Sequence, residues 1–246
     1  MTKRMWTFAG RCGKEILRDP LSMAFGLGFP LVLLCLLSLI QSNVPVALFE
    51  IQKLTPGVTV FGLSFITLFS ATIIAKDRGS ALLQRLYTTP MTARDFILGY
   101  TVPVLPLALG QTFVCYLAAL FWGLEWETGR ILLALVCQIP VAILYIGLGL
   151  LCGSAFTDKQ VGGICGGLLT NLSAWLAGIW FDLDLVGGTF EKIANLLPFV
   201  HAVEMERAAI NGQLDGILEH LIWVLGYAIV IVVAAVYVFL CQSKKQ

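Results

Sequence analysis

Long apolar runs constrain the fold of this chain more than any other feature of its sequence. A transmembrane α-helix needs about 20 consecutive apolar residues, and several runs here reach that length. Only 13% of the 246 residues are charged, whereas about a quarter are charged in a typical soluble domain. A water-soluble fold would lack the polar surface to cover itself, so the pattern predicts an all-α integral membrane protein. The net charge of +1 gives no sign of a nucleic-acid partner.

Six membrane spans are predicted, and together they make one transmembrane domain over residues 1–246. Their approximate ranges are 21–40, 56–75, 96–122, 131–156, 161–181 and 217–241. Six spans place both termini on one side of the membrane. If that side is the cytoplasm, it holds twelve of the sixteen Lys and Arg residues, and basic residues favour the cytoplasmic side. We therefore expect a plasma-membrane protein with both termini in the cytoplasm.

Residues 1–20 have a different pattern, in which apolar residues recur at helical spacing among Lys and Arg. The apolar positions are Met5, Phe8, Ala9, Cys12 and Ile16. This pattern predicts an amphipathic helix in the inner membrane interface, with a short soluble helix as the alternative. Asp19 and Pro20 then suit the N-cap and the first turn of the next helix.

The predicted spans carry no Asp, Glu, Lys, Arg or His near their middles. Charged groups at that depth commonly mark proton relays and ion pathways, so the pattern argues against a proton-coupled carrier or a cation channel. Uncharged polar residues do occur at depth, where they bond neighbouring helices or line a pathway. The candidates for a pathway lining are Ser64, Thr67, Thr101, Gln111, Asn171 and Ser173.

Glycines and cysteines inside the apolar runs predict packing rather than chemistry. Glycines at four-residue spacing allow helices to approach closely, and they occur at Gly149 and Gly153 and again at Gly162 and Gly166. The seven cysteines form no C-x-x-C pair, so we expect neither a metal nor a redox site. No catalytic group of residues is predicted.

The longest cytoplasmic loop is predicted over residues 76–95. Its apolar residues Leu82, Leu83, Leu86 and Tyr87 share one helical face, and Pro90 ends that helix. Residues 92–95 (Thr-Ala-Arg-Asp) have the form of a capping box that begins the third span. The pattern predicts a short amphipathic helix at the membrane surface over about 77–87. Lipid could cover its apolar face, but a groove on a cytoplasmic protein fits better.

This loop resembles the coupling-helix segment of ABC transporter permeases of the type-2 exporter class. The resemblance rests on Lys-Asp-Arg-Gly-Ser at 76–80, Leu-Tyr-Thr-Thr-Pro-Met-Thr at 86–92 and Arg-Asp-Phe-Ile-Leu-Gly at 94–99. The basic segment 14–20 and the outer segment 197–203 are also similar. The family often has two acids before the glycine and one after it, whereas only Asp77 precedes Gly79 here.

The resemblance implies a permease subunit that works with a separate ATP-hydrolysing subunit. The sequence has no P-loop, so no cofactor is expected on this chain, and ATP and Mg would bind the partner ATPase. Two ATPase copies and a second permease copy, making a homodimer, are implied. The expected contacts with the ATPase are Asp77, Arg78, Leu82, Leu83, Arg85, Leu86, Tyr87, Arg11 and Lys14.

The function expected from these patterns is outward export of an amphiphilic or hydrophobic substrate such as a drug, a peptide or a lipid-linked molecule. The alternative is a stand-alone secondary carrier or facilitator. The outer segment over 182–216 is expected to contain one or two short helices, as a structural cap or as an exit gate.

Overall fold

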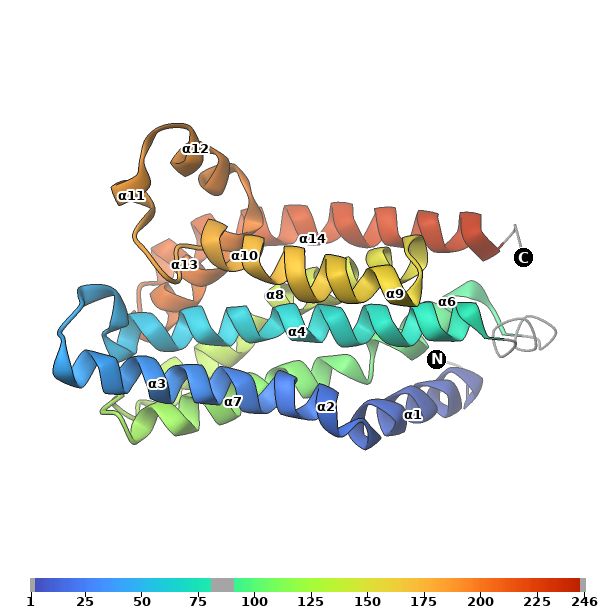
Figure 1. Ribbon diagram of the computed structural model, residues 1–246, viewed down its shortest axis with the longest axis horizontal. Helices are drawn as coiled ribbons and strands as arrows, with labels where there is room; N and C mark the ends of the chain where they lie inside the picture. The colour runs from blue at the N-terminus through green and yellow to red at the C-terminus, as the bar shows by residue number, and fades with distance from the viewer. Residues whose placement is uncertain (1–2, 81–90, 244–246) are drawn as a thin grey trace.

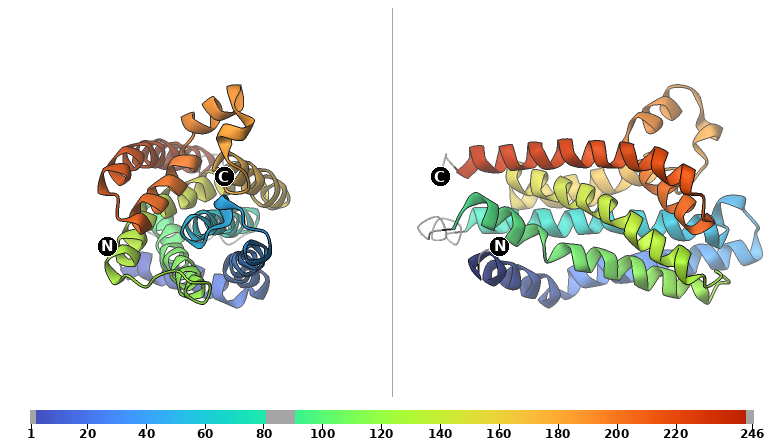
Figure 2. Two further views of the ribbon diagram at one scale, coloured as in Figure 1. Left: turned by 90° about the vertical axis from the view of Figure 1, so that its left-hand side faces the viewer. Right: turned by 180° about the vertical axis from the view of Figure 1, so that it is seen from behind.

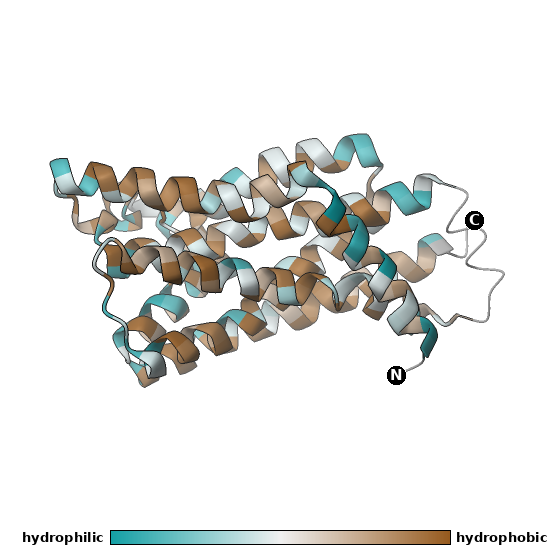
Figure 3. Ribbon diagram, turned by 90° about the horizontal axis from the view of Figure 1, so that it is seen from below, coloured by the Kyte–Doolittle hydropathy of each residue, from teal (hydrophilic) through white to brown (hydrophobic). Residues whose placement is uncertain are grey.

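The computed structural model describes residues 3–80 and 91–243, and these residues fold into a bundle of helices (Figure 1). The described ranges contain no strand, so the predicted all-α class is confirmed. Apolar residues cover most of the length of the bundle, whereas polar residues gather toward its ends (Figure 3). In chain order the elements are α1 (Lys3–Arg18), α2 (Pro20–Met23), the π-helix η1 (Ala24–Gly28), α3 (Phe29–Asn43), the 3-10 helix η2 (Ala47–Phe49), α4 (Ile51–Gly79), α6 (Ala93–Thr101), α7 (Val104–Leu120), α8 (Thr128–Ala155), α9 (Asp158–Val161), the π-helix η3 (Gly162–Leu169), α10 (Thr170–Leu176), α11 (Leu183–Val186), α12 (Gly188–Leu196), α13 (Pro198–Asn211) and α14 (Leu214–Ser243).

Within residues 3–80 and 91–243, five helical segments are long and apolar enough to cross a membrane. They are Pro20–Asn43, Ile51–Gly79, Ala93–Leu120, Thr128–Ala155 and Leu214–Gln242. The predicted count of six spans is not confirmed, because the fifth predicted span is built from α9, η3 and α10. This segment begins with a polar turn at Asp158 and ends at Leu176, which shortens its apolar part. It nevertheless runs along α4 (Figure 1).

The start of α1 and the end of α14 lie at the same end of the bundle (Figures 1 and 2). This placement agrees with the expectation that the two termini share one side of the membrane. Which side that is stays a prediction from the distribution of Lys and Arg.

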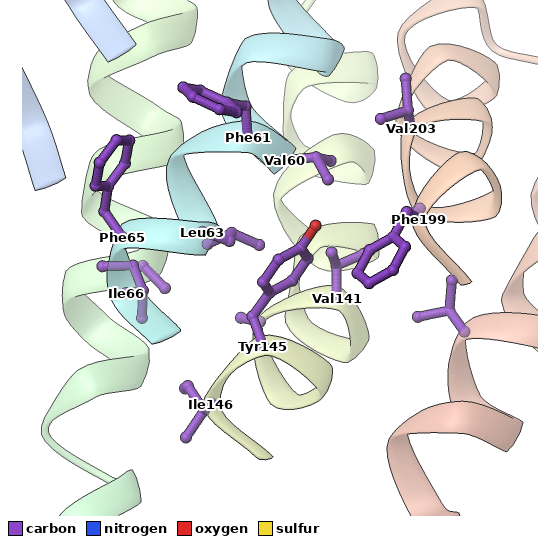
Figure 4. Packing of buried hydrophobic residues seen from close by; sticks show 14 of the residues in the cluster. Val60, Phe61, Leu63, Phe65, Ile66, Val141, Tyr145, Ile146, Phe199 and Val203 are labelled. Atoms are coloured by element: carbon purple, nitrogen blue, oxygen red, sulfur yellow. The ribbon is translucent and has the colours of Figure 1, made fainter. Parts of the chain in front are cut away.

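Helix α4 is the centre of the bundle. Of the 18 residues in its apolar stretch, 89% are buried. Helices α8, α7, α13 and α3 pack around it. Figure 4 shows Leu63 and Val60 of α4 facing Tyr145 of α8 and Phe199 of α13. Because dense apolar packing transmits displacement, a shift of α4 would be felt by all of these helices.

Two glycines of α8 bring its backbone directly against α4. A Cβ atom at Gly153 would lie 2.6 Å from the carbonyl oxygen of Ala71, and one at Gly149 would lie 2.8 Å from that of Thr67. The predicted close approach is therefore confirmed for this helix. In η3, a Cβ at Gly166 would lie 3.2 Å from the side chain of Leu68 on α4, whereas one at Gly162 would meet none of the described residues within 4 Å. The close approach predicted there is therefore found at Gly166 and not at Gly162.

Helix α1 has the predicted amphipathic pattern, since its five predicted apolar positions are all buried. Its apolar face packs on α6, where Phe8 contacts the rings of Phe96 and Tyr100. Protein therefore covers this face, which the sequence pattern assigned to the membrane interface. The predicted cap at Asp19 is confirmed, because its carboxylate accepts bonds from the backbone N–H groups of Leu21 and Ser22.

The predicted surface loop begins later in the chain than expected, because α4 continues past Ala75 to Gly79. The predicted capping box is confirmed: the Thr92 N–H donates to Asp95 at 3.0 Å, and the Asp95 N–H donates to the Thr92 hydroxyl at 3.4 Å. The third predicted span is interrupted near Pro103 and divides into α6 and α7.

The outer segment contains three helices, where one or two were predicted. Helices α11 and α12 project from the bundle (Figures 1 and 2). Helix α13 packs against α14, α8 and α4, and it is buried along most of its length. It ends at Gly212, whose φ of +71° is a left-handed conformation that glycine adopts easily.

The contact between α4 and α8 predicts the outcome of a glycine substitution. Gly153→Ala would force the two backbones apart, and we expect it to destabilise the protein by about 1–3 kcal/mol. Gly226→Ala is the matched control, because a Cβ at Gly226 of α14 meets nothing within 4 Å. Thermal unfolding in detergent micelles, followed by near-UV circular dichroism, measures both. Equal losses in the two variants would contradict this packing.

Candidate functional site

Arg11 of α1 and Asp77 of α4 form an ion pair near the end of the bundle where α4 terminates. The guanidinium binds both carboxylate oxygens of Asp77, with an Nη2–Oδ1 distance of 2.8 Å. Tyr100 of α6 donates its hydroxyl to the same carboxylate at 2.9 Å. One carboxylate, whose residue is only 3% exposed, therefore joins three helices. We call Arg11, Asp77 and Tyr100 the basal joint.

The charges of the basal joint depend on one another. The hydrogen bond to Asp77 is the main cause that raises the pKa of Arg11, so its guanidinium stays charged. Glu15, one turn along α1, contacts the same guanidinium at 2.7 Å. Removing the cation would leave a buried carboxylate without a counter-charge, which is strongly unfavourable.

Cys12 follows Arg11 on α1, and its thiol adds no charge to this network. Burial raises the pKa of its thiol to about 12, so the thiol is neutral at physiological pH. It fills space as a small apolar side chain, as the sequence pattern predicts.

Aromatic packing holds α1 on α6 beside the basal joint. The ring of Phe8 lies edge-on to Phe96 and Tyr100, with centroid distances of 5.6 and 4.9 Å. A Cβ at Gly99 would lie 2.3 Å from Phe8, so the ring occupies space that only glycine leaves open. The close contact fixes the position of α1 relative to the start of the third span.

Arg78 fastens the same end of α4 to α8. Its Nη1 donates to the carbonyl oxygen of Gly153 at 2.9 Å and to that of Phe156 at 3.4 Å. Gly153 lies in the last turn of α8, where carbonyl groups lack partners within the helix, and Phe156 is the C-cap residue of that helix. The end of α4 is therefore bonded to α1, α6 and α8.

The predicted contact residues divide into two groups in the structure. Arg11, Asp77 and Arg78 come together at the end of α4, and Lys14 is exposed on α1. The others fall outside the described residues: Leu82, Leu83, Arg85, Leu86 and Tyr87. Because Asp77 is buried, its carboxylate serves the fold, and a contact of this set with another chain stays a prediction.

The polar residues predicted to line a pathway are spread over several helices. Four are buried: Ser64, Thr67, Gln111 and Ser173. The Thr67 hydroxyl donates across helices to the Tyr145 carbonyl at 2.7 Å, as expected for an interhelical bond. Thr101 is half-buried, and Asn171 is exposed on α10, where it bonds Gly167 at 2.7 Å. A pathway role for these residues stays a prediction.

Glu206 of α13 is a fully buried acid that is not among the predicted site residues. It accepts the hydroxyl of Tyr116 at 3.0 Å and so joins α13 to α7. Burial raises the pKa of Glu206 well above its ordinary value. Its spacing carried a usable signal, since Ala202 and Ile210 stand four residues before and after it and place it on an apolar helical face.

His201 and His220, the two histidines of the chain, join α13 to α14. Their Nδ1 atoms are 3.0 Å apart, and His201 Nε2 lies 2.9 Å from the carbonyl oxygen of Asn195. A carbonyl only accepts, so Nε2 carries a hydrogen and a neutral His201 accepts from His220. Burial lowers the pKa of His201, which favours this neutral form. The ring also stacks on Trp223 at 4.8 Å.

A family model described as ABC-2 type transporter matches residues 3–211. The match runs from α1 to the end of α13, so it includes the basal joint, Arg78 and Glu206. No curated protein matches the chain.

A double-mutant cycle tests the basal joint. Arg11→Gln leaves Asp77 buried without its cation, and we expect a loss of about 1–3 kcal/mol. In an Asp77→Asn background the same change should cost much less, because the partner charge is already gone. The control is Arg130→Gln, which breaks an exposed pair with Glu127 and should cost under about 1 kcal/mol.

Thermal unfolding of the full chain in detergent measures all four variants of the cycle and the control. Additive losses from the Arg11 and Asp77 changes would contradict an ion pair that stabilises the fold.

Proposed function

The chain belongs to the ABC-2 type transporter family, and on that premise we propose that it is the membrane-spanning subunit of an exporter. In this proposal a separate cytoplasmic chain binds ATP and Mg and supplies the energy. Two copies of the permease and two copies of the ATPase form the working unit. The unit lies in the plasma membrane with the termini of the permease in the cytoplasm.

The proposal rests on the contacts that hold in place the two helix ends on either side of residues 81–90. On one side, the basal joint and Arg78 hold the end of α4. On the other side, the capping box of Thr92 and Asp95 begins α6. A force applied to residues 81–90 would therefore act on fixed helix ends and would not be lost in a loose loop.

The same contacts provide a route for that force into the membrane. The basal joint links α4 to α1 and α6, and Arg78 links α4 to α8. Further along, the contacts at Gly149 and Gly153 hold α8 against α4. A push on the end of α4 would then displace packed helices together, as a transporter driven from the cytoplasm requires.

The proposed energy source agrees with the composition of the spans. Each of the five candidate spans has an 18-residue window with at most two charged residues. Coupling to an ion gradient commonly uses ionisable residues inside the membrane. A subunit moved mechanically by an ATPase has no such requirement, so ATP hydrolysis on the partner is the better source.

The proposed cargo is amphiphilic or hydrophobic, and the apolar helix faces on the outside of the bundle support this. In Pro20–Asn43 and in Leu214–Gln242, only 22% of the 18-residue apolar stretch is buried. Lipid or a second permease copy would cover these apolar faces. A pathway formed between two such copies would offer uncharged surfaces, which suit a drug, an amphipathic peptide or a lipid-linked molecule.

The outer helices are proposed to close the far end of this pathway. Helix α13 is held by Tyr116 through Glu206 and by His220 through His201. These bonds make α13 a firm cap in this conformation, and an outward-open state would require some of them to change.

Charged substitutions in residues 81–90 test the coupling role. We expect the double change Leu83→Asp and Leu86→Asp to abolish the stimulation of ATP hydrolysis by the permease, because a charged face cannot fill an apolar groove. The assay measures phosphate release by the purified complex of the chain with its co-purifying ATPase. Leu185→Asp is the control, since Leu185 is 81% exposed on α11 at the far end of the bundle.

Undiminished stimulation in the double variant, with the control also unchanged, would remove residues 81–90 from the coupling. Loss of stimulation in the control as well would show a general effect of added charge and would equally contradict the assignment.

A further inference from the structure

A cleft of about 860 Å³ lies between α1, α2 and α4, at the same end of the bundle as the basal joint. The size is typical of a small-molecule site. One wall comes from α1 and the α1–α2 junction, including Trp6, Lys14 and Arg18, and the other comes from α4, including Phe69 and Lys76. The proposed function gives this cleft no role.

The acids that line the cleft are already bonded. Glu15 pairs with Arg11 at 2.7 Å. Asp19 accepts the Ser22 hydroxyl at 2.7 Å and caps α2. The bonds from Ser22 chiefly, with Lys76 among the weaker causes, lower the pKa of Asp19. Glu15 is therefore paired, whereas Asp19 keeps its negative charge and offsets part of the positive charge in the cleft.

More basic than acidic side chains line the cleft. Arg11 is bound by Asp77 and Glu15. Within the described part of the chain, Lys14, Arg18 and Lys76 take part in no ion pair. All three are exposed, and two opposite walls contribute them. The cleft therefore presents positive charge from both sides, which suits a phosphate group.

The cleft also has an apolar side that a soluble anion would not use. Phe69 and Ile73 of α4 line it, and they belong to a candidate membrane span. Trp6 lines it as well and is 55% exposed, as is typical of a tryptophan at a membrane interface. Helix α2, which forms the rim at Ser22, begins another candidate span. Positive charge and an apolar wall therefore meet where one candidate span begins and another ends.

We infer that this cleft binds an anionic phospholipid of the inner leaflet. Arg18 and Lys76 hold the phosphate from opposite walls, and the first part of an acyl chain lies along Phe69 and Ile73. Lys14, already assigned to the ATPase contact, adds positive charge to the same cleft. The bound lipid joins α1 to α4, the two helices that the Arg11–Asp77 pair also joins.

The test uses Trp6 as a reporter inside the cleft. The full chain is reconstituted in phosphatidylcholine vesicles containing a minor fraction of brominated phosphatidylglycerol or of brominated phosphatidylcholine. Bromine quenches tryptophan fluorescence on contact, and subtraction of the Trp6→Phe variant isolates the signal of Trp6. We expect stronger quenching by the brominated phosphatidylglycerol at equal mole fraction.

The variants Arg18→Gln and Lys76→Gln should each lower this preference about fivefold, since a basic residue near anionic lipid contributes on the order of 1 kcal/mol. The matched control is the double variant Arg94→Gln and Lys159→Gln. Both of these residues are exposed cations at the same end of the bundle, and neither lines the cleft. The control should retain the preference.

Three results would overturn the inference. Equal quenching by both brominated lipids would show no anionic lipid at Trp6. Equal losses in the cleft variants and the control would show a general attraction to the basic surface. Loss of the difference on adding glycerol 3-phosphate would assign the cleft to a soluble phosphate compound. The assay needs neither ATPase nor cargo, so its outcome is independent of the proposed function.

Discussion

The carboxylate of Asp77 is almost completely removed from water, and it needs Arg11 and Tyr100 to compensate for that loss. Because the three residues come from α4, α1 and α6, this requirement sets the position of the N-terminal helix against the second and third of the spans that follow it. The neighbouring Arg78 extends the constraint to α8. The end of the central helix is thereby bonded to α1, α6 and α8, and residues 81–90 follow it in the chain.

The bundle has polar bonds at both ends and apolar packing between them. At the far end, Tyr116–Glu206 and His201–His220 hold α13 over the spans. Close to the basal joint, the backbones of α4 and α8 approach each other at Gly149 and Gly153. A displacement at one end would therefore be carried by packed helices and resisted by bonds at the other end. This arrangement suits a subunit that is moved from outside the membrane and closes its far side with a cap.

Local sequence patterns predicted the local structure well. The apolar stripe of α1, the cap at Asp19 and the capping box at Thr92 each depend on residues a few positions apart, and each is confirmed. The contacts of Asp77 with Tyr100 and of Glu206 with Tyr116 join distant parts of the chain, so no periodicity reveals them. The glycines show the same limit: their spacing does not tell whether another helix or open space faces them. The number of spans depends on where the segment of α9, η3 and α10 begins and ends; it begins at Asp158 and ends shortly before Gly178, whose φ is +62°.

The proposed function depends on a cytoplasmic ATPase that binds residues 81–90. The most direct measurement places a single cysteine at Leu86 in a variant with the native cysteines replaced, and labels it with a membrane-impermeant maleimide from each side. We expect labelling only from the cytoplasmic side, and protection from labelling when the ATPase is bound. Labelling from the external side, or unchanged labelling in the presence of the ATPase, would contradict the proposed function.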